Sequence, residues 1–441
     1  MKRCRRLALG ALIAVIAIAG VTFAACEGPT GPQGEPGLDG PQGPGGPGGL
    51  PGPGTPIRNV YFIPWNSDWD GGEDISVALI ALLNRLIEAG DLEDYAVAVN
   101  VHGGEAMLTG ADRTNPAHWT PSGLFLPYTV IEGFLDYVDS ISDSMAVVET
   151  DVAYGVPFFG GTPTIRFGAT HSAMLANHFP NWDTVVLDYD GAVGGTLIND
   201  MPGTRGHIEV PVPMGRRIEY ALIGEGLEDF DFVINLSHFT GHSMSGFGGT
   251  IKNMGLGLSS IQGKMLAHTG GANPFSWGGG LGTAAFQEAL SEVALAVREF
   301  MEGNILHITV VNNLSKDCDC WSGIAAGGGG QASPDIYCVG ILASWDPVAV
   351  DQAAMNLIME ANRTQYRRTT SLEHMLGVDG LPSLISGPVL ARAQAMGVRP
   401  EGAGSSLLGY FANTNGQWKL DWGQRIGLGS VHYRLVTLEL P

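Results

Sequence analysis

Residues 128–149 read YTVIEGFLDYVDSISDSMAVVE, and this stretch contains a predicted helix followed directly by a predicted strand. Apolar side chains recur at helical spacing from Tyr128 to Ser140, which predicts an amphipathic helix. Met145 to Glu149 is a short apolar run, typical of a buried strand, and a similar run from Tyr95 to Val101 precedes the helix. The order strand, helix, strand predicts a unit of a parallel sheet.

The same alternation continues over residues 57–441, which we predict to be one globular α/β domain. Further strands are expected at Val60 to Pro64, Thr184 to Asp188, Phe232 to Leu236, Leu306 to Val311 and Tyr337 to Ala343. Further helices are expected at Ile75 to Ala89, at Phe286 to Met301, and from the N-cap Asp346 through Met359. The predicted fold is a mostly parallel sheet with helices on both faces, in which ligands bind at the carboxyl ends of the strands.

Residues 1–25 are predicted to be a signal peptide. A basic start, MKRCRR, precedes an uncharged run from Leu7 to Ala25. Phe23-Ala24-Ala25-Cys26 is typical of a lipobox, so Cys26 is expected to carry a lipid and to hold an exported protein on the periplasmic or cell-surface side of a membrane. An uncleaved anchor and ordinary secretion are the alternatives, and Arg5-Arg6 leaves a twin-arginine route open beside general secretion.

Residues 26–56 follow as the lipidated cysteine and a collagen-like spacer. Glycine recurs at every third position from Gly28 to Gly52, with proline frequent between, and nine such triplets would extend about 80 Å at ~3.1 Å per residue. One interpretation is a short triple helix that makes the protein a homotrimer. The other is a flexible tether without partners.

The formal net charge of −21, with only 15% charged residues, argues against nucleic acid as a partner. It also argues against anionic lipid as a partner and suits a soluble exported protein. Acidity alone gives nothing more specific.

Residues 237–253, SHFTGHSMSGFGGTIKN, are expected to form a loop after the strand Phe232 to Leu236. Gly248 and Gly249 would let the backbone approach a ligand, His242 offers an imidazole for proton transfer or metal binding, and Lys252 offers an amine for charge or covalent attachment. The alternative is a tight structural turn with surface histidines.

Three cysteines remain in the domain, Cys318, Cys320 and Cys338. Side chains two apart on an extended segment share a face, so Cys318 and Cys320 could chelate one soft ion such as iron or zinc, with Cys338 and His238 as possible further ligands. A disulfide, with Cys338 paired to one of the two, is the alternative.

In these residues the chain resembles the family called domain of unknown function 362, often described as iron-sulfur-centre proteins. The resemblance includes Ser237 to Gly257, Gly263-Lys264 with His268, the Cys318-Asp319-Cys320 motif, and the segment from Gly340 to Asp351. Many relatives insert two ferredoxin-type cysteine clusters after the position of His268, and this chain has none there. Relatives commonly have lysine at the positions of Asn100 and Thr240, so any anion pocket is less basic here.

The spacing of His242, Lys252 and His268 also resembles the nickel-pincer lactate racemases. That resemblance implies that Lys252 holds a pyridinium-derived cofactor, that His268 binds nickel, and that His242 is one acid/base group. His178 is a second acid/base candidate, and a helix-terminal surface histidine is its alternative.

Two classes of function follow. One is a metal-dependent enzyme that acts on a small carboxylate or hydroxy acid by proton or hydride transfer. The other is a non-catalytic surface protein that binds a metal or cluster through Cys318 and Cys320. Asp346 and Asp351 are predicted to stabilise the start of their own helix rather than to take part in either.

Overall fold

The computed structural model describes residues 58–65, 72–88, 90–101, 128–150, 175–176, 179–188, 206–242, 244–274, 283–312, 314, 339–364 and 416–440. The strands in these ranges are β1 (Asn59–Pro64), β2 (Ala96–Val101), β3 (Ser144–Glu149), β4 (Asp183–Val186), β5 (His207–Pro211), β6 (Tyr220–Gly224), β7 (Phe232–His238), β8 (Thr240–His242), β9 (Gly246–Gly248), β10 (Ile305–Val311), β11 (Gly340–Ser344) and β12 (Arg434–Thr437). The helices are α1 (Gly72–Leu86), α2 (Tyr128–Ile141), the 3-10 helix η3 (Glu225–Asp229), α4 (Thr250–Gly257), α5 (Ile261–His268), α6 (Ala284–Phe300), α8 (Pro347–Thr364) and α13 (Gly416–Arg425).

An eight-stranded sheet organises the domain, in the order β12-β1-β11-β10-β7-β2-β3-β4. All its neighbouring pairs are parallel except those of β11, which runs antiparallel to both β1 and β10. The expected α/β fold with a mostly parallel sheet is therefore confirmed. The strands predicted from apolar runs are all present, with ends shifted by a few residues.

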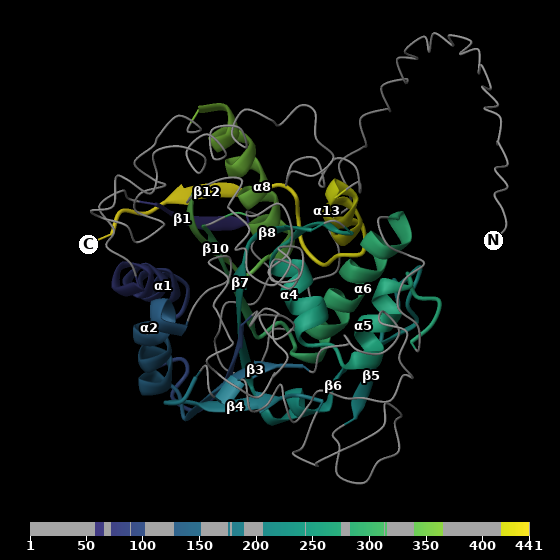
Figure 1. Ribbon diagram of the computed structural model, residues 1–441, viewed down its shortest axis with the longest axis horizontal. Helices are drawn as coiled ribbons and strands as arrows, with labels where there is room; N and C mark the ends of the chain where they lie inside the picture. Colours follow the sequence, from purple (N-terminus) through teal and green to yellow (C-terminus); the bar gives the residue numbers. More distant parts are fainter. Residues whose placement is uncertain are drawn as a thin grey trace, which may run out of the picture. The chain divides into compact units, whose positions relative to one another are not determined.

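Helices cover both faces of the sheet (Figure 1). α1 and α2 pack on one face, and α4 and α8 pack on the other, with α6 and α13 lying behind α4. Alternate strand residues supply the two cores. Val97, Val99, Ile234 and Ile308 belong to the α1/α2 core, whereas Ala98 and Val233 belong to the core that contains α4.

The expected loop at residues 237–253 is wrong. This stretch completes β7, forms the β8–β9 hairpin and begins α4. The hairpin pairs three residues from each strand, too few to show an apolar alternation, and Gly246 takes a positive φ of 79° at its turn. A glycine-rich composition thus predicted irregular backbone where short regular elements lie.

None of the described helices is long and apolar enough to cross a membrane. The predicted signal peptide, Cys26 and the collagen-like stretch lie outside the described residues. Their export, anchoring and spacer roles stay predictions.

Candidate functional site

The candidate site begins where β7 leaves the carboxyl edge of the sheet and the chain turns into the β8–β9 hairpin. Thr240 pairs with Gly248, and His242 pairs with Gly246. The Phe239 and Phe247 rings stack at 5.2 Å and fix the hairpin against the core. Because residues two apart on a strand point to the same side, His242 lies on the same side of the hairpin as Thr240.

His242 is buried, and its tautomer is fixed by backbone donors. Its Nδ1 accepts hydrogen bonds from the backbone N–H groups of Met244 at 3.2 Å and Ser245 at 3.0 Å. An Nδ1 that accepts cannot carry the proton of a neutral imidazole, so the proton lies on Nε2. Neutral His242 therefore presents an Nε2–H donor.

Lys252 lies in the first turn of α4, and its side chain lies back over Gly248. A Cβ placed on Gly248 would be 3.5 Å from the Lys252 Cδ, 4.0 Å from its Nζ, and 2.7 Å from the Thr240 Oγ1. A Cβ on Gly249 would be 2.5 Å from the Asp351 Oδ1. A side chain at either position would meet a neighbouring group. Gly248 leaves room for the Lys252 side chain and the Thr240 hydroxyl, and Gly249 leaves room for the Asp351 carboxylate.

His268 ends α5 and is fully buried against the Phe286 ring, 5.0 Å away. Its Nδ1 donates to the Lys264 carbonyl at 2.6 Å. Burial is the main reason that the pKa of His268 is lowered to about 3; the hydrogen bond to the Lys264 carbonyl opposes this effect, and the positive charges of Lys252 and Lys264 add to it. His268 is therefore neutral at pH 7, and its lone pair lies on Nε2.

Lys252 and Lys264 both lie close enough to His268 to act on its charge. Lys264 is half-buried, and its Nζ donates to the Thr150 carbonyl at 3.1 Å, just after β3. Of the predicted site residues, Lys252 thus acts on His268 through its charge. Lys264 adds a second amine that the sequence motif contained but to which no role was given.

The start of each short helix at the site is occupied by a carboxylate of the protein itself. Asp351 accepts from the N–H groups of Thr250 at 2.7 Å and Ile251 at 3.0 Å, at the start of α4. Asp188 accepts from the Ile261 N–H at 3.0 Å, at the start of α5. Helix starts often bind phosphate, and here those donors are already used.

The two aspartates of the α8 segment act as helix caps, with one correction. Asp346 caps α8 as predicted, accepting from the Ala349 N–H at 2.9 Å, and it also pairs with Arg58 at 2.7 Å. Asp351 was expected to stabilise the start of its own helix, and it stabilises the start of α4 instead. Its position one turn into α8 turns the carboxylate toward the neighbouring helix, which sequence alone does not reveal.

A buried polar network lies between α4 and the sheet. The Asn235 amide donates to the Thr250 carbonyl at 3.0 Å and to the His307 Nδ1 at 3.2 Å. Asn253 donates to the Asn235 Oδ1 at 2.8 Å, and Asn100 donates to the same oxygen at 3.1 Å. Burial lowers the pKa of His307 to about 3, so this histidine is also neutral. The network ties α4 to β2, β7 and β10.

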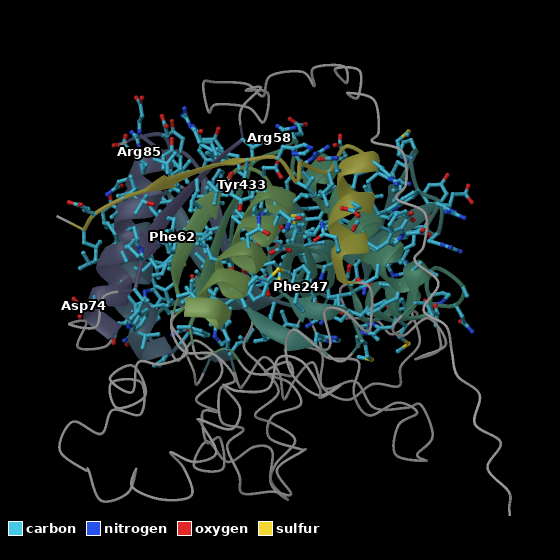
Figure 2. All side chains as sticks on the ribbon, turned by 90° about the horizontal axis from the view of Figure 1, so that it is seen from above. Arg58, Phe62, Asp74, Arg85, Phe247 and Tyr433 are labelled. Carbon is cyan, nitrogen blue, oxygen red and sulfur yellow. The ribbon has the colours of Figure 1, made fainter. Side chains whose placement is uncertain are left out.

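Lys419, on α13, is a buried lysine that the sequence analysis did not single out. Its Nζ donates to the Phe247 carbonyl at 2.9 Å and lies 3.4 Å from the centre of the Phe247 ring. Figure 2 shows Phe247 inside the molecule, near α8 and α13. Burial lowers the pKa of Lys419, and the nearby Asp351 carboxylate opposes that effect. No sequence signal separates such a lysine from one on the exposed face of an amphipathic helix.

Several predicted site residues lie outside the described part of the chain. They are His178, Cys318, Cys320 and Cys338. His238, a possible extra ligand, uses its Nε2 on the Asn312 carbonyl at 2.7 Å. Within the described ranges, no group of three or more His, Cys, Asp or Glu side chains is arranged to hold a metal ion.

The fold and the site together define an α/β protein that carries two buried histidines, His242 and His268, and two lysines, Lys252 and Lys264, in the segments that follow β7. Residues 188–356 match the family described as "Domain of unknown function (DUF362)". The segment contains His242, Lys252, His268 and the Cys318-Cys320 pair.

The chain is also similar to a solved structure, the lactate racemase apoprotein from Thermoanaerobacterium thermosaccharolyticum. The identity is 12% and the TM-score 0.36, over 87% of this chain and 83% of that chain. A TM-score this low supports no shared activity. No curated protein matches the sequence.

Proposed function

We propose that this chain is an exported, lipid-anchored enzyme that binds a small carboxylate-bearing molecule, such as a hydroxy acid, and moves a proton or a hydride on it. The observation that carries the proposal is the buried cluster around His268. The neutral imidazole of His268 donates its Nδ1 proton to a carbonyl, and the positive charges of Lys252 and Lys264 act on it. That arrangement is costly to bury and is typical of a functional site.

The charges of the cluster favour an anionic ligand. Lys252 and Lys264 supply positive charge, and two carboxylates, Asp351 and Asp188, are engaged by the starts of α4 and α5. A ligand carboxylate would therefore meet amines rather than like charge. The His242 Nε2–H can donate to a second oxygen of such a ligand, for example a hydroxyl.

The described residues of this site could supply only part of the coordination shell of a metal ion. Histidines that bind metals commonly donate their other ring N–H to a carbonyl, as His268 does to Lys264. One histidine does not complete a coordination shell, and the described residues contain no three-ligand group. A metal at His268 would thus need further ligand atoms from an organic group, and a nickel-type cofactor attached to Lys252 meets that requirement.

Such a group, when bound, would supply a hydride acceptor. The protein's own residues would then bind, orient and protonate. Lys264 would hold the ligand carboxylate, the His242 Nε2–H would bind its oxygen, and His178 is proposed as a second proton-transfer group.

The proposal is tested by elemental analysis and intact mass of the full chain purified from a native-type host. We expect stoichiometric nickel and an added mass on Lys252. His268→Gln should lose the metal, whereas His307→Gln, which alters an equally buried and neutral histidine, should retain it. Lys252→Met should lose the adduct and Lys264→Met should keep it.

Activity is checked with single enantiomers of a panel of small 2-hydroxy acids, by following loss of optical rotation, which reports transfer of either a proton or a hydride at the α-carbon. Absence of metal and adduct would contradict the proposal. Iron or zinc that disappears in a Cys318→Ser/Cys320→Ser variant would instead support the non-catalytic alternative.

The location of the enzyme is a separate part of the proposal. Cys26 would carry the lipid, and residues 26–56 would hold the domain away from the membrane. Incorporation of labelled palmitate should be lost in Cys26→Ala, and retained label would contradict anchoring at this residue. A homotrimer that dissociates in Gly40→Ala would support a triple helix, because only glycine fits at its axis, and a monomeric full chain would support a tether.

A further inference from the structure

We propose that Asp351 and Lys419 are positioning residues for Lys252, which hold the backbone of residues 247–251 from two separate helices so that the lysine amine is fixed over Gly248. The inference rests on the proposed function, since it assigns a purpose to the position of Lys252. Neither Asp351 nor Lys419 lies beside the ligand in this scheme. Both act through the short segment between them.

Lys419 holds the first end of that segment. It comes from α13, far along the chain, and its Nζ donates to the Phe247 carbonyl at 2.9 Å while lying over the Phe247 ring. The Lys419 side chain is fully buried. An ammonium is expensive to bury, so its placement on one peptide carbonyl indicates a specific role at that peptide.

Asp351 holds the second end. Its two oxygens accept from the Thr250 and Ile251 N–H groups, and its Oδ1 lies where a Cβ on Gly249 would be. A carboxylate at a helix start also stabilises that helix through its dipole. The start of α4 is therefore fixed by a residue of α8.

Gly248 lies between these two fixed ends, and it is the residue over which Lys252 lies. The peptide 247–248 is held by Lys419, and the peptides that begin α4 are held by Asp351. Because the Lys252 amine would be only 4.0 Å from a Cβ at Gly248, a shift of this short segment would move the amine directly. The opposite charges of Asp351 and Lys419 attract each other, so the residues that fix the two ends of the segment also stabilise each other.

The opposite view is that these charges only stabilise the fold. The experiment therefore measures the position of the Lys252 amine separately from stability. The full chain, made in a host that leaves Lys252 unmodified, is reductively methylated with ¹³C-formaldehyde and cyanoborohydride. Mass spectrometry gives the ratio of methylation rates at Lys252 and Lys264, and ¹³C NMR gives the chemical shift of the methylated Lys252.

In Lys419→Met, which removes the donor to Phe247, we expect the Lys252 to Lys264 rate ratio to change by at least threefold. The Lys252 methyl signal should move toward the position of exposed lysines. Lys419→Gln keeps an N–H donor for the same carbonyl and should stay near the wild-type ratio and shift. Leu82→Ala, which destabilises the opposite face of the sheet, should leave both readouts unchanged.

A folded Lys419→Met variant with the wild-type ratio and shift would overturn the proposal. If that variant does not fold, Asp351→Asn takes its place, with the same displacement expected and the same outcome overturning it. These readouts use protein without metal or adduct. The positioning role and the proposed function can therefore fail separately, since nickel or a Lys252 adduct in the wild type is measured independently.

Discussion

The two faces of the central sheet are built from the same strands and differ in chemistry. On the α1/α2 face, residues such as Val99, Ile234 and Ile308 form a core of hydrocarbon. On the α4 face, their neighbours Asn235 and His307 carry buried polar groups. Strand alternation thus divides each strand into a side that stabilises the fold and a side that supports the site.

Hydrogen bonds among its own groups stabilise the polar face, although the buried Asn100 Oδ1 has no hydrogen-bond partner among the described residues. Asn235 alone joins α4, β10, Asn253 and Asn100 through its amide. A buried polar group costs free energy when it lacks a partner, so such a network holds one arrangement of α4 and opposes others. The hydrocarbon face is built mainly from apolar side chains, and it should tolerate exchange among similar ones.

The largest effect should come from a cavity on the hydrocarbon face. Leu82→Ala removes a fully buried side chain of α1 and should lower the free energy of unfolding by about 2–5 kcal/mol. Urea unfolding measures the loss. The comparison of the faces is broken if this variant also changes the modification of Lys252, since α1 lies on the other side of the sheet.

The next largest effect should come from acid, which should lower the free energy of unfolding through protonation of His307 on the α4 face. The folded pKa of His307 is about 3 and its ordinary value is 6.5, so the unfolded chain binds the proton more tightly between these values. The His307 contribution to stability is present above pH 6.5 and is lost as pH falls toward 3.

Between pH 6 and 4, unfolding free energy should fall more steeply in the wild type than in His307→Leu, by about 1.4 kcal/mol per pH unit. Urea titrations at a series of pH values give the two slopes. Asp346, whose pKa burial raises to about 6, acts in the opposite direction in both proteins and cancels from the difference. Equal slopes would show that His307 is not held neutral.

A smaller loss is expected from the polar network itself. Asn235→Leu leaves Asn253 and Asn100 without their shared acceptor and should cost about 1–3 kcal/mol. Hydrogen exchange should speed up in α4 and stay unchanged in α1 and α2. Faster exchange on both faces would mean that the network supports the whole domain rather than α4.

The smallest effect should be at the exposed contact between α1 and α2. The Tyr137 hydroxyl donates to the Asn84 Oδ1 at 2.7 Å at the surface. Tyr137→Phe should cost less than about 1 kcal/mol, because water replaces an exposed hydrogen bond. Thermal melts compare the stability of Tyr137→Phe with that of Asn235→Leu. An equal loss of stability in the two variants would mean that buried and exposed hydrogen bonds contribute alike in this protein.

The strands and long helices were predictable because burial on both faces of a parallel sheet leaves continuous apolar runs. The run Phe232 to Leu236 predicted β7, although it contains Asn235 at the centre of the network. One polar residue in an apolar run does not reveal which face it points to or what it binds. The short elements β8, β9 and α4 were missed for lack of any period long enough to detect.

From the sequence, only those parts of the candidate site that lie in one local stretch could be proposed. His242 and Lys252 were predicted as site residues because reactive residue types recur there with glycine, and His268 was predicted from the family resemblance alone. The partners of Lys252 were not identified, since Asp351 acts on a different helix from the one expected and Lys419 lies in a helix with ordinary amphipathic spacing. Contacts between distant segments are set by packing, which a single sequence does not record.

The position of β1 has a consequence for the order in which the protein forms. β1 is made early, yet its two neighbours in the sheet are β11 and β12, which are among the last strands of the chain. Arg58 can likewise form its ion pair with Asp346 only after residue 346 has been synthesised. A growing chain therefore carries β1 with both hydrogen-bonding edges open until β11 (Gly340–Ser344) has been synthesised, and with one edge open until β12 (Arg434–Thr437) follows. Unpaired edges of this kind promote aggregation, so a nascent or truncated chain should need a chaperone that the finished protein does not.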